Sequence, residues 1–186
     1  PNTYEFFWNT SALKFREKMW KSYKNFWTNA RVDRANQIGL NPKDVICLAS
    51  VVQKESQKAD ERPRVAGVYI NRLNRKMKLQ ADPTIIYALK LKYKNFDTVI
   101  KRVLYKDLKI KSPFNTYLKS GLPPGPITMP DLSAIEAVLN YERHNFLYFV
   151  ANPNQPGYHL FATNGRSHER NKKVYTNWLN RNRVYR

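Results

Sequence analysis

The sequence has few of the residues that build common metal and cofactor sites. Its single cysteine, Cys47, cannot form an intrachain disulfide, and its position in an apolar segment indicates a packing role. The three histidines, His144, His159 and His168, have neither zinc-ligand spacing nor a cysteine partner. The phosphate-binding glycine loop, the G-x-S-x-G motif and the H-E-x-x-H motif are all missing. We therefore expect no metal and no cofactor.

Long hydrophobic runs are missing as well. No stretch is long or apolar enough to span a bilayer, and no signal peptide is visible. The chain begins at Pro1 rather than at Met, so we expect a targeting segment to precede it in the full-length protein. Its 186 residues, 42% of them hydrophobic, are enough for one folded domain over residues 1–186.

Acidic residues are scarce relative to basic ones. The chain has 33 Lys and Arg against 14 Asp and Glu, which gives a net charge of +19. Such a charge attracts polyanions, including nucleic acid, acidic polysaccharide and the anionic face of a membrane. Because the basic residues are scattered over the whole chain, the charge does not specify which of these is the partner.

The apolar spacing predicts an α+β fold, with helices followed by a small antiparallel sheet. Residues 1–9 are expected to form a strand or an extended entry segment, and Thr10 or Ser11 is expected to cap a long helix. The aromatic stripe of that helix is interpreted as core; it consists of Phe15, Met19, Trp20, Tyr23, Phe26 and Trp27. The other expected helices cover 41–59, the segment from Pro63, 82–89, 131–141 and 166–180, and the strands cover 146–151 and 158–162. Residues 112–130 are rich in Pro and Gly and predict a long functional loop.

The helix expected over 41–59 carries an unusual carboxylate. Asn41 is a good N-cap, Pro42 suits the first helical position and Asp44 can complete a capping box. Glu55 follows Val51 by four residues, so it lies on the apolar face of this helix. Burial disfavours the charged carboxylate and raises its pKa, which would make Glu55 a candidate general acid. The alternative is a glutamate at the edge of the core that pairs with a nearby Lys or Arg.

A single acid limits the chemistry that can be expected. Ordinary glycoside hydrolysis uses two carboxylates, whereas one suffices when the substrate supplies its own nucleophile. Six segments then resemble, in order, the endolytic murein transglycosylase family (MltG, or YceG-like), over about residues 1–171. They are LASVVQKES, ERPRVAGVYINRL, LQADPTIIYAL, FNTYLKSGLPPGPI, FLYFVA and GYHLFAT, with His168 after them.

The resemblance implies a lytic transglycosylase that cleaves the MurNAc–GlcNAc bond of nascent peptidoglycan. The catalytic glutamate of the family falls on Glu55, and a second glutamate that members often carry is replaced here by Gln53. Glu55 would protonate the glycosidic oxygen and then accept the proton of the muramic acid C6 hydroxyl, which closes on C1 to give a 1,6-anhydro end. The implied substrate contacts are Asn71, Gln80, Asp82, Asn115, Thr116, Tyr117 and His159.

Some of these positions also have structural interpretations. Asp82 could be a helix cap, Tyr117 a structural aromatic residue and His159 a satisfied structural histidine. The chain departs from the family at 127–131, where the usual Asn-Pro-Gly is replaced by Met129, Pro130 and Asp131.

By resemblance, peptidoglycan glycan strands are the substrate and peptidoglycan synthases are candidate partners. One N-terminal membrane anchor and a LysM-like region would precede this fragment, and the catalytic domain would lie on the periplasmic, extracytoplasmic side of the inner membrane. A basic nucleic-acid-binding module is the rival hypothesis, although no recognition motif is visible and we expect no nucleic acid. The third hypothesis is a scaffold that binds the cell wall but has no catalytic activity.

Overall fold

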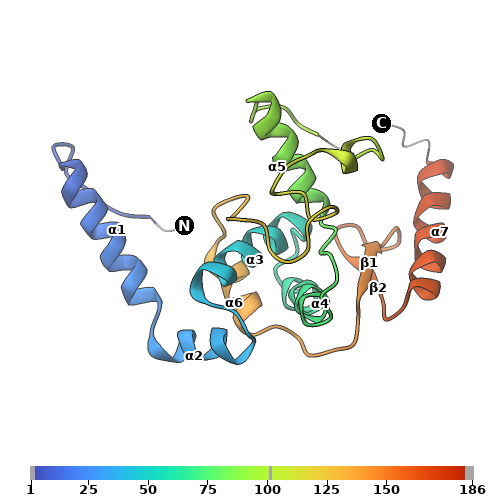
Figure 1. Cartoon of the computed structure of the whole chain (residues 1–186), viewed down its shortest axis with the longest axis horizontal. Helices are drawn as coiled ribbons and strands as arrows, with labels where there is room; N and C mark the ends of the chain where they lie inside the picture. Colours follow the sequence, from blue (N-terminus) through green and yellow to red (C-terminus); the bar gives the residue numbers. More distant parts are fainter. Residues whose placement is uncertain (1–2, 101, 183–186) are drawn as a thin grey trace.

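The computed structural model describes residues 3–100 and 102–182. This part of the chain forms seven α-helices, one short 3-10 helix and one two-stranded antiparallel sheet (Figure 1). In chain order they are α1 (Ala12–Phe26), α2 (Asn29–Gln37), α3 (Pro42–Glu55), α4 (Arg62–Asn74), α5 (Asp82–Tyr93), the 3-10 helix Asp107–Lys109, α6 (Leu132–Leu139), β1 (Tyr148–Ala151), β2 (His159–Ala162) and α7 (Gly165–Arg181). The α+β prediction is confirmed.

Helix α3 lies at the centre of the core, in contact with α2, α4, α5 and α6 (Figure 1). The predicted capping box is present, because the Asn41 side chain accepts from the Asp44 N–H while the Asp44 carboxylate accepts from the Asn41 N–H. The apolar face of α3 is also as predicted, with Val45, Leu48, Ala49, Val51 and Val52 all fully buried. Burial of each large side chain stabilises the fold by about 1.5–3 kcal/mol. The buried face of α3 therefore anchors this helix in the core, and Glu55 is the last residue of the helix.

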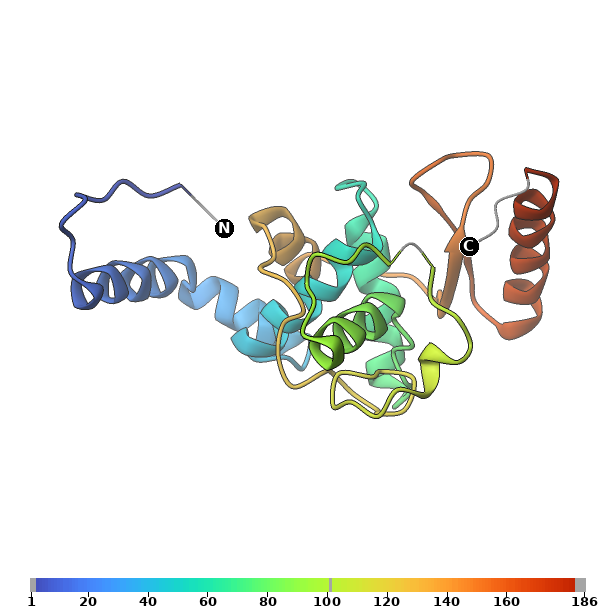
Figure 2. The ribbon, with the colours of Figure 1, turned by 90° about the horizontal axis from the view of Figure 1, so that it is seen from above.

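Helix α1 differs from the prediction. None of its residues is buried, and Phe15, Trp20 and Tyr23 are 49%, 56% and 38% exposed. Figures 1 and 2 show α1 extending away from the core beyond α2, which the sequence did not predict. Only Phe26 and the adjacent Trp27 pack against the core. The interpretation of the whole stripe as core is therefore wrong, because periodicity identifies an apolar face but not what covers it.

Residues 3–9 contain no strand, and residues 1 and 2 of the expected extended segment lie outside the described residues. Helix α5 also differs in detail. It continues to Tyr93, and its N-cap is Ala81, so Asp82 is the first helical residue and its side chain makes no capping bond. The expectation that Asp82 caps this helix is therefore wrong, which leaves its carboxylate available for another partner.

The predicted hairpin and C-terminal helix are present at the end of the molecule opposite α1 (Figure 1). Strands β1 and β2 pair antiparallel, with Ala151 opposite His159 and Tyr148 opposite Ala162, and α7 packs on both strands. The hairpin reaches the helical core through Phe149, whose ring meets that of Tyr69 on α4 edge to face at 5.8 Å. No helix within residues 3–100 and 102–182 has the length and apolarity needed to cross a membrane.

Candidate active site

Glu55 is the last residue of α3 and is half-buried. Its Oε1 accepts a 2.6 Å hydrogen bond from the hydroxyl of Tyr69, which is itself 1% exposed on α4. Burial raises the pKa of Glu55 to about 7, and the negative charge of Asp82 adds to this increase. The hydrogen bond from Tyr69 and the electrostatic effects of His159 and Arg72 lower the pKa of Glu55 and so partly offset the increase. None of the ion pairs in the described part of the chain includes Glu55. The core-edge pairing with Lys or Arg is therefore absent.

Asp82 brings a second carboxyl group close to Glu55. The Tyr117 hydroxyl donates to Asp82 Oδ1 at 2.6 Å. Burial raises the pKa of Asp82, and this hydrogen bond only partly offsets the effect. Since the charge of Asp82 raises the pKa of Glu55, the two carboxyl groups are electrostatically coupled. The sequence reasoning treated Glu55 as an isolated acid, because nothing in the spacing indicated that the start of α5 returns to the end of α3.

His159 is held by Glu61, a residue that the sequence reasoning did not select. The Glu61 carboxylate is 2.7 Å from His159 Nδ1 and also accepts from the His159 N–H at 2.8 Å and from the Ser56 hydroxyl at 3.1 Å. Burial alone would raise the pKa of Glu61, but the hydrogen bonds from His159 and Ser56 outweigh it and lower the pKa. This contact directs Nδ1 toward Glu61, so His159 is oriented as a structural histidine would be.

Three of the predicted substrate contacts form structural hydrogen bonds. The Asn71 amide donates to two carbonyls of the segment before β1, and the Asn115 amide donates to two carbonyls around the 3-10 helix. The Thr116 hydroxyl accepts from the Ala81 N–H. Gln80 differs from them because it is exposed, with a φ of 50°, beside the site. Asn115 and Thr116 are fully buried and therefore support the loop that carries Tyr117.

Arg72 is a second residue that the sequence reasoning missed. Its side chain is almost fully buried, donates to the carbonyls of Leu147 and Leu79 at 2.6 and 2.7 Å, and lies 5.2 Å from the centre of the Tyr148 ring. No acidic residue in the described ranges forms an ion pair with it. Arg72 therefore links α4 to β1 and places a positive charge that lowers the pKa of Glu55.

A cleft of about 880 Å³ lies beside these groups. It is lined from α4, the start of α5, the 102–108 loop, β1 and α7, and its walls include Arg72, Gln80, Asp82, Tyr117 and Phe149. Glu55 is not itself a lining residue, but Phe149 packs on Tyr69, whose hydroxyl donates to Glu55, so this chain of contacts connects Glu55 to the cleft. The volume is in the range that ligand sites of proteins have.

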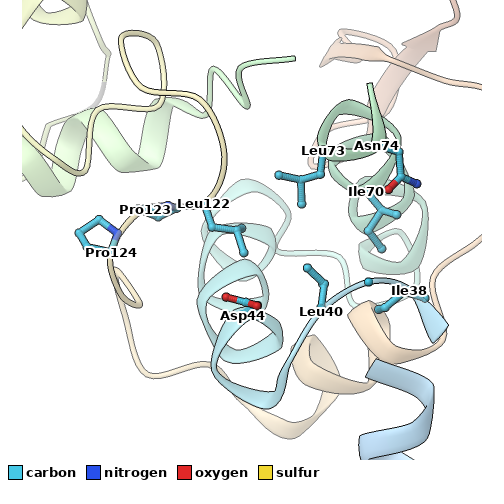
Figure 3. Close-up of a pocket in the computed structure, with 10 residues that line it drawn as sticks. Ile38, Leu40, Asp44, Ile70, Leu73, Asn74, Leu122, Pro123 and Pro124 are labelled. Atoms are coloured by element: carbon cyan, nitrogen blue, oxygen red, sulfur yellow. The ribbon is translucent and has the colours of Figure 1, made fainter. Parts of the chain in front are cut away.

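A separate cavity of about 560 Å³ lies at the other end of α3 (Figure 3). Figure 3 shows that Leu40, Ile70, Leu73 and Leu122 converge on it from different segments. Its only ionisable lining residue among those described is Asp44, whose carboxylate already belongs to the capping box. This cavity therefore has no acid or base available for chemistry, and the 880 Å³ cleft is the better candidate.

The loop that departs from the family pattern is attached to α3. The Gln53 side-chain oxygen accepts from the Asp131 N–H at 2.6 Å, and the Ser50 hydroxyl accepts from the Ile127 N–H at 3.0 Å. Asp131 also caps α6 by accepting from the Ala134 N–H, and its carboxylate pairs with Arg62. Gln53, for which the resemblance implies a second glutamate in other members, therefore has a structural partner here.

The fold and the site together define a candidate acid–base centre, in which a half-buried glutamate with a pKa raised to about 7 is connected through Tyr69 and Phe149 to an open cleft. A model of the YceG-like family matches residues 1–174, and the chain belongs to this family. The endolytic murein transglycosylase of Bacillus subtilis (strain 168) is 34% identical over 175 residues, which cover 94% of this chain and 46% of the relative.

Two further similarities agree with this assignment. The endolytic murein transglycosylase of Streptococcus pneumoniae serotype 2 (strain D39) is 38% identical over 138 residues, which are 74% of this chain and 24% of that protein. The crystal structure of a yceG-like protein from Listeria monocytogenes superposes with a TM-score of 0.75 at 33% identity, covering 91% of this chain and 53% of the other. The chain thus spans about half or less of each of these proteins.

Proposed function

We propose that this chain is the catalytic region of an endolytic peptidoglycan lytic transglycosylase, with Glu55 as general acid and then base. The observation that carries the proposal is the Glu55 carboxyl, whose pKa of about 7 leaves a large fraction protonated at neutral pH. Family membership supports it, because the curated relatives are named endolytic murein transglycosylases.

The geometry suggests how the proton is handled. Tyr69 donates to Glu55 Oε1, which leaves Oε2 to carry the proton that goes to the glycosidic oxygen. As the bond between C1 of MurNAc and the leaving oxygen breaks, the C6 hydroxyl of the same sugar bonds to C1. Its proton then passes to the Glu55 carboxylate, which the Tyr69 hydroxyl has stabilised in the meantime. No water is consumed, and Glu55 ends the cycle protonated.

Because Asp82 is a second carboxyl group near Glu55, hydrolysis of the glycosidic bond is the specific alternative to the transglycosylase reaction. Two carboxylates that flank a glycosidic bond can act as acid and base, with water as the nucleophile. The Tyr117 hydroxyl, however, already donates to Asp82 and occupies one of its oxygens. We therefore assign Asp82 to substrate positioning and to raising the pKa of Glu55.

The test is digestion of purified glycan strands by the wild type, by Glu55→Gln and by a matched control, Glu142→Gln. Glu142 lies in an exposed ion pair with Arg64, away from the cleft. We expect 1,6-anhydromuramic ends from the wild type and Glu142→Gln, and none from Glu55→Gln. Reducing ends would mean hydrolysis, and undiminished activity of Glu55→Gln would remove Glu55 from the mechanism.

The rival functions give different results in the same preparation. A nucleic-acid-binding module would bind DNA or RNA with a steep salt dependence and would not cleave glycan. An inactive wall-binding scaffold would sediment with peptidoglycan and leave its strands intact.

For the full-length protein we propose one membrane anchor, with this domain on the extracytoplasmic side, where nascent peptidoglycan is made. The net charge of +19 is consistent with a position near an anionic membrane and wall. Protease accessibility of the domain in cells stripped of their wall tests this location. Co-purification with peptidoglycan synthases tests the proposed partners.

A further inference from the structure

One side of the cleft is not used in the proposed reaction. The 102–108 loop contributes Arg102 and Lys106 to it, and α7 contributes Lys172. These three residues are here called the cationic arm. Arg102 and Lys106 are exposed, and neither takes part in an ion pair within the described residues. Two basic groups without acidic partners among the described residues therefore line the same cleft as Asp82.

The charges that line the cleft do not balance. Four cationic side chains, the cationic arm and Arg72, face two carboxylates, Asp82 and Glu169, which leaves an excess of two positive charges. Glu169 is 3.4 Å from Lys172 in a solvent-exposed pair, and such pairs are weak. Asp82 is bonded to Tyr117. Among the charged residues that line the cleft, the 102–108 segment therefore contributes only cations, whereas α5 contributes the carboxylate of Asp82.

Aromatic rings also line the cleft. His168 stacks on Tyr148 with ring centres 5.1 Å apart, and both residues line the cleft. Burial lowers the pKa of His168, and the positive charges of Lys172 and Arg72 add to this effect while the negative charge of Glu169 opposes it, so the neutral form of the ring is favoured. His168 Nδ1 has no hydrogen-bond partner within the described residues. The lining of the cleft thus combines a carboxylate, aromatic rings and cations.

We propose that the cationic arm binds the carboxylates of the stem peptide on muramic acid, so that strands with intact stems are preferred. The inference rests on the proposed function. In peptidoglycan the stem is attached through the lactyl group to the same sugar whose C1 reacts, so an anionic chain leaves the sugar close to Glu55. The Arg102 guanidinium can hold a carboxylate through two parallel hydrogen bonds, and Lys106 adds a point charge.

The experiment compares two substrates made from one preparation: glycan strands with their stem peptides, and the same strands stripped of stems by an amidase. The test variant is Arg102→Ala with Lys106→Ala. The matched control is Arg75→Ala with Lys119→Ala, which removes the same two charges at exposed positions that do not line the cleft. Melting temperatures verify that both variants fold.

For stem-bearing strands, we expect kcat/KM of the test variant to fall about tenfold, equivalent to about 1.4 kcal/mol, mainly through KM. On stripped strands the test variant, the control and the wild type should agree within about twofold. Equal losses on both substrates, or no loss on either, would overturn the proposal. The proposal would also be overturned if a poly(glycerol phosphate) chain inhibited the wild type while kcat/KM was the same for strands with and without stems, because the cationic arm would then bind phosphate. Failure of the proposed function looks different, since the wild type would then give no anhydro ends from either substrate.

Discussion

The hydrogen bond from Tyr69 to Glu55 should affect the pH dependence of the reaction, because it acts on the pKa of Glu55. It favours the carboxylate, so Tyr69→Phe should raise the pKa of Glu55 further above 7. A hydrogen bond to a charged group contributes about 1.5–3 kcal/mol, and water can replace part of it at this half-buried site. We therefore expect a loss of about 1.4 kcal/mol, which moves the pKa up by about one pH unit.

The assay is release of anhydromuramic ends, with kcat/KM measured from pH 5 to pH 9. The general acid must be protonated, so kcat/KM should fall as the pH rises through about 7 in the wild type. In Tyr69→Phe this decline should begin about one pH unit higher. Asp82→Asn is the control of opposite sign: it removes a negative charge that raises the pKa of Glu55, so the decline should move to lower pH. A decline at the same pH in all three proteins would refute the assignment of Glu55 as the acid.

Three further predictions concern stability. The pKa of Glu55 is raised from 4.5 to about 7, so its proton stabilises the folded state below pH 4.5, and this stability is lost as the pH rises to about 7. The Tm of Glu55→Gln minus that of the wild type should therefore increase between pH 5 and pH 8, by roughly 5–10 °C for about 2–3 kcal/mol. A difference in Tm that stays constant with pH would contradict this. Leu48→Ala, in the fully buried face of α3, should lower the free energy of unfolding by about 2–5 kcal/mol in denaturant titration, and a loss below 1 kcal/mol would contradict the placement of α3. Asp131→Ala should cost about 1–3 kcal/mol, because it removes the α6 cap and the partner of Arg62, and Asp131→Asn, which keeps a capping oxygen, should cost less.

Much of the local structure could be predicted because its causes are local. The capping box of α3, the irregular 112–130 segment and the hairpin each follow from residues close together in the sequence. The prediction failed at α1, where an aromatic periodicity typical of core helices is exposed. It also failed at Asp82, where a good capping residue is instead the first residue of its helix and bonds to Tyr117.

By itself, the sequence determined that a glutamate lies on the apolar face of a well-capped helix, because helical spacing fixes which side chains share a face. Only the tertiary structure decided what surrounds it. Tyr69, Asp82 and Arg72 come from α4 and α5, and their effect on Glu55 depends on distances that no spacing rule contains. The pKa of a buried carboxyl group is set by desolvation and by charges a few ångströms away, so the sequence could select the acid but not its strength.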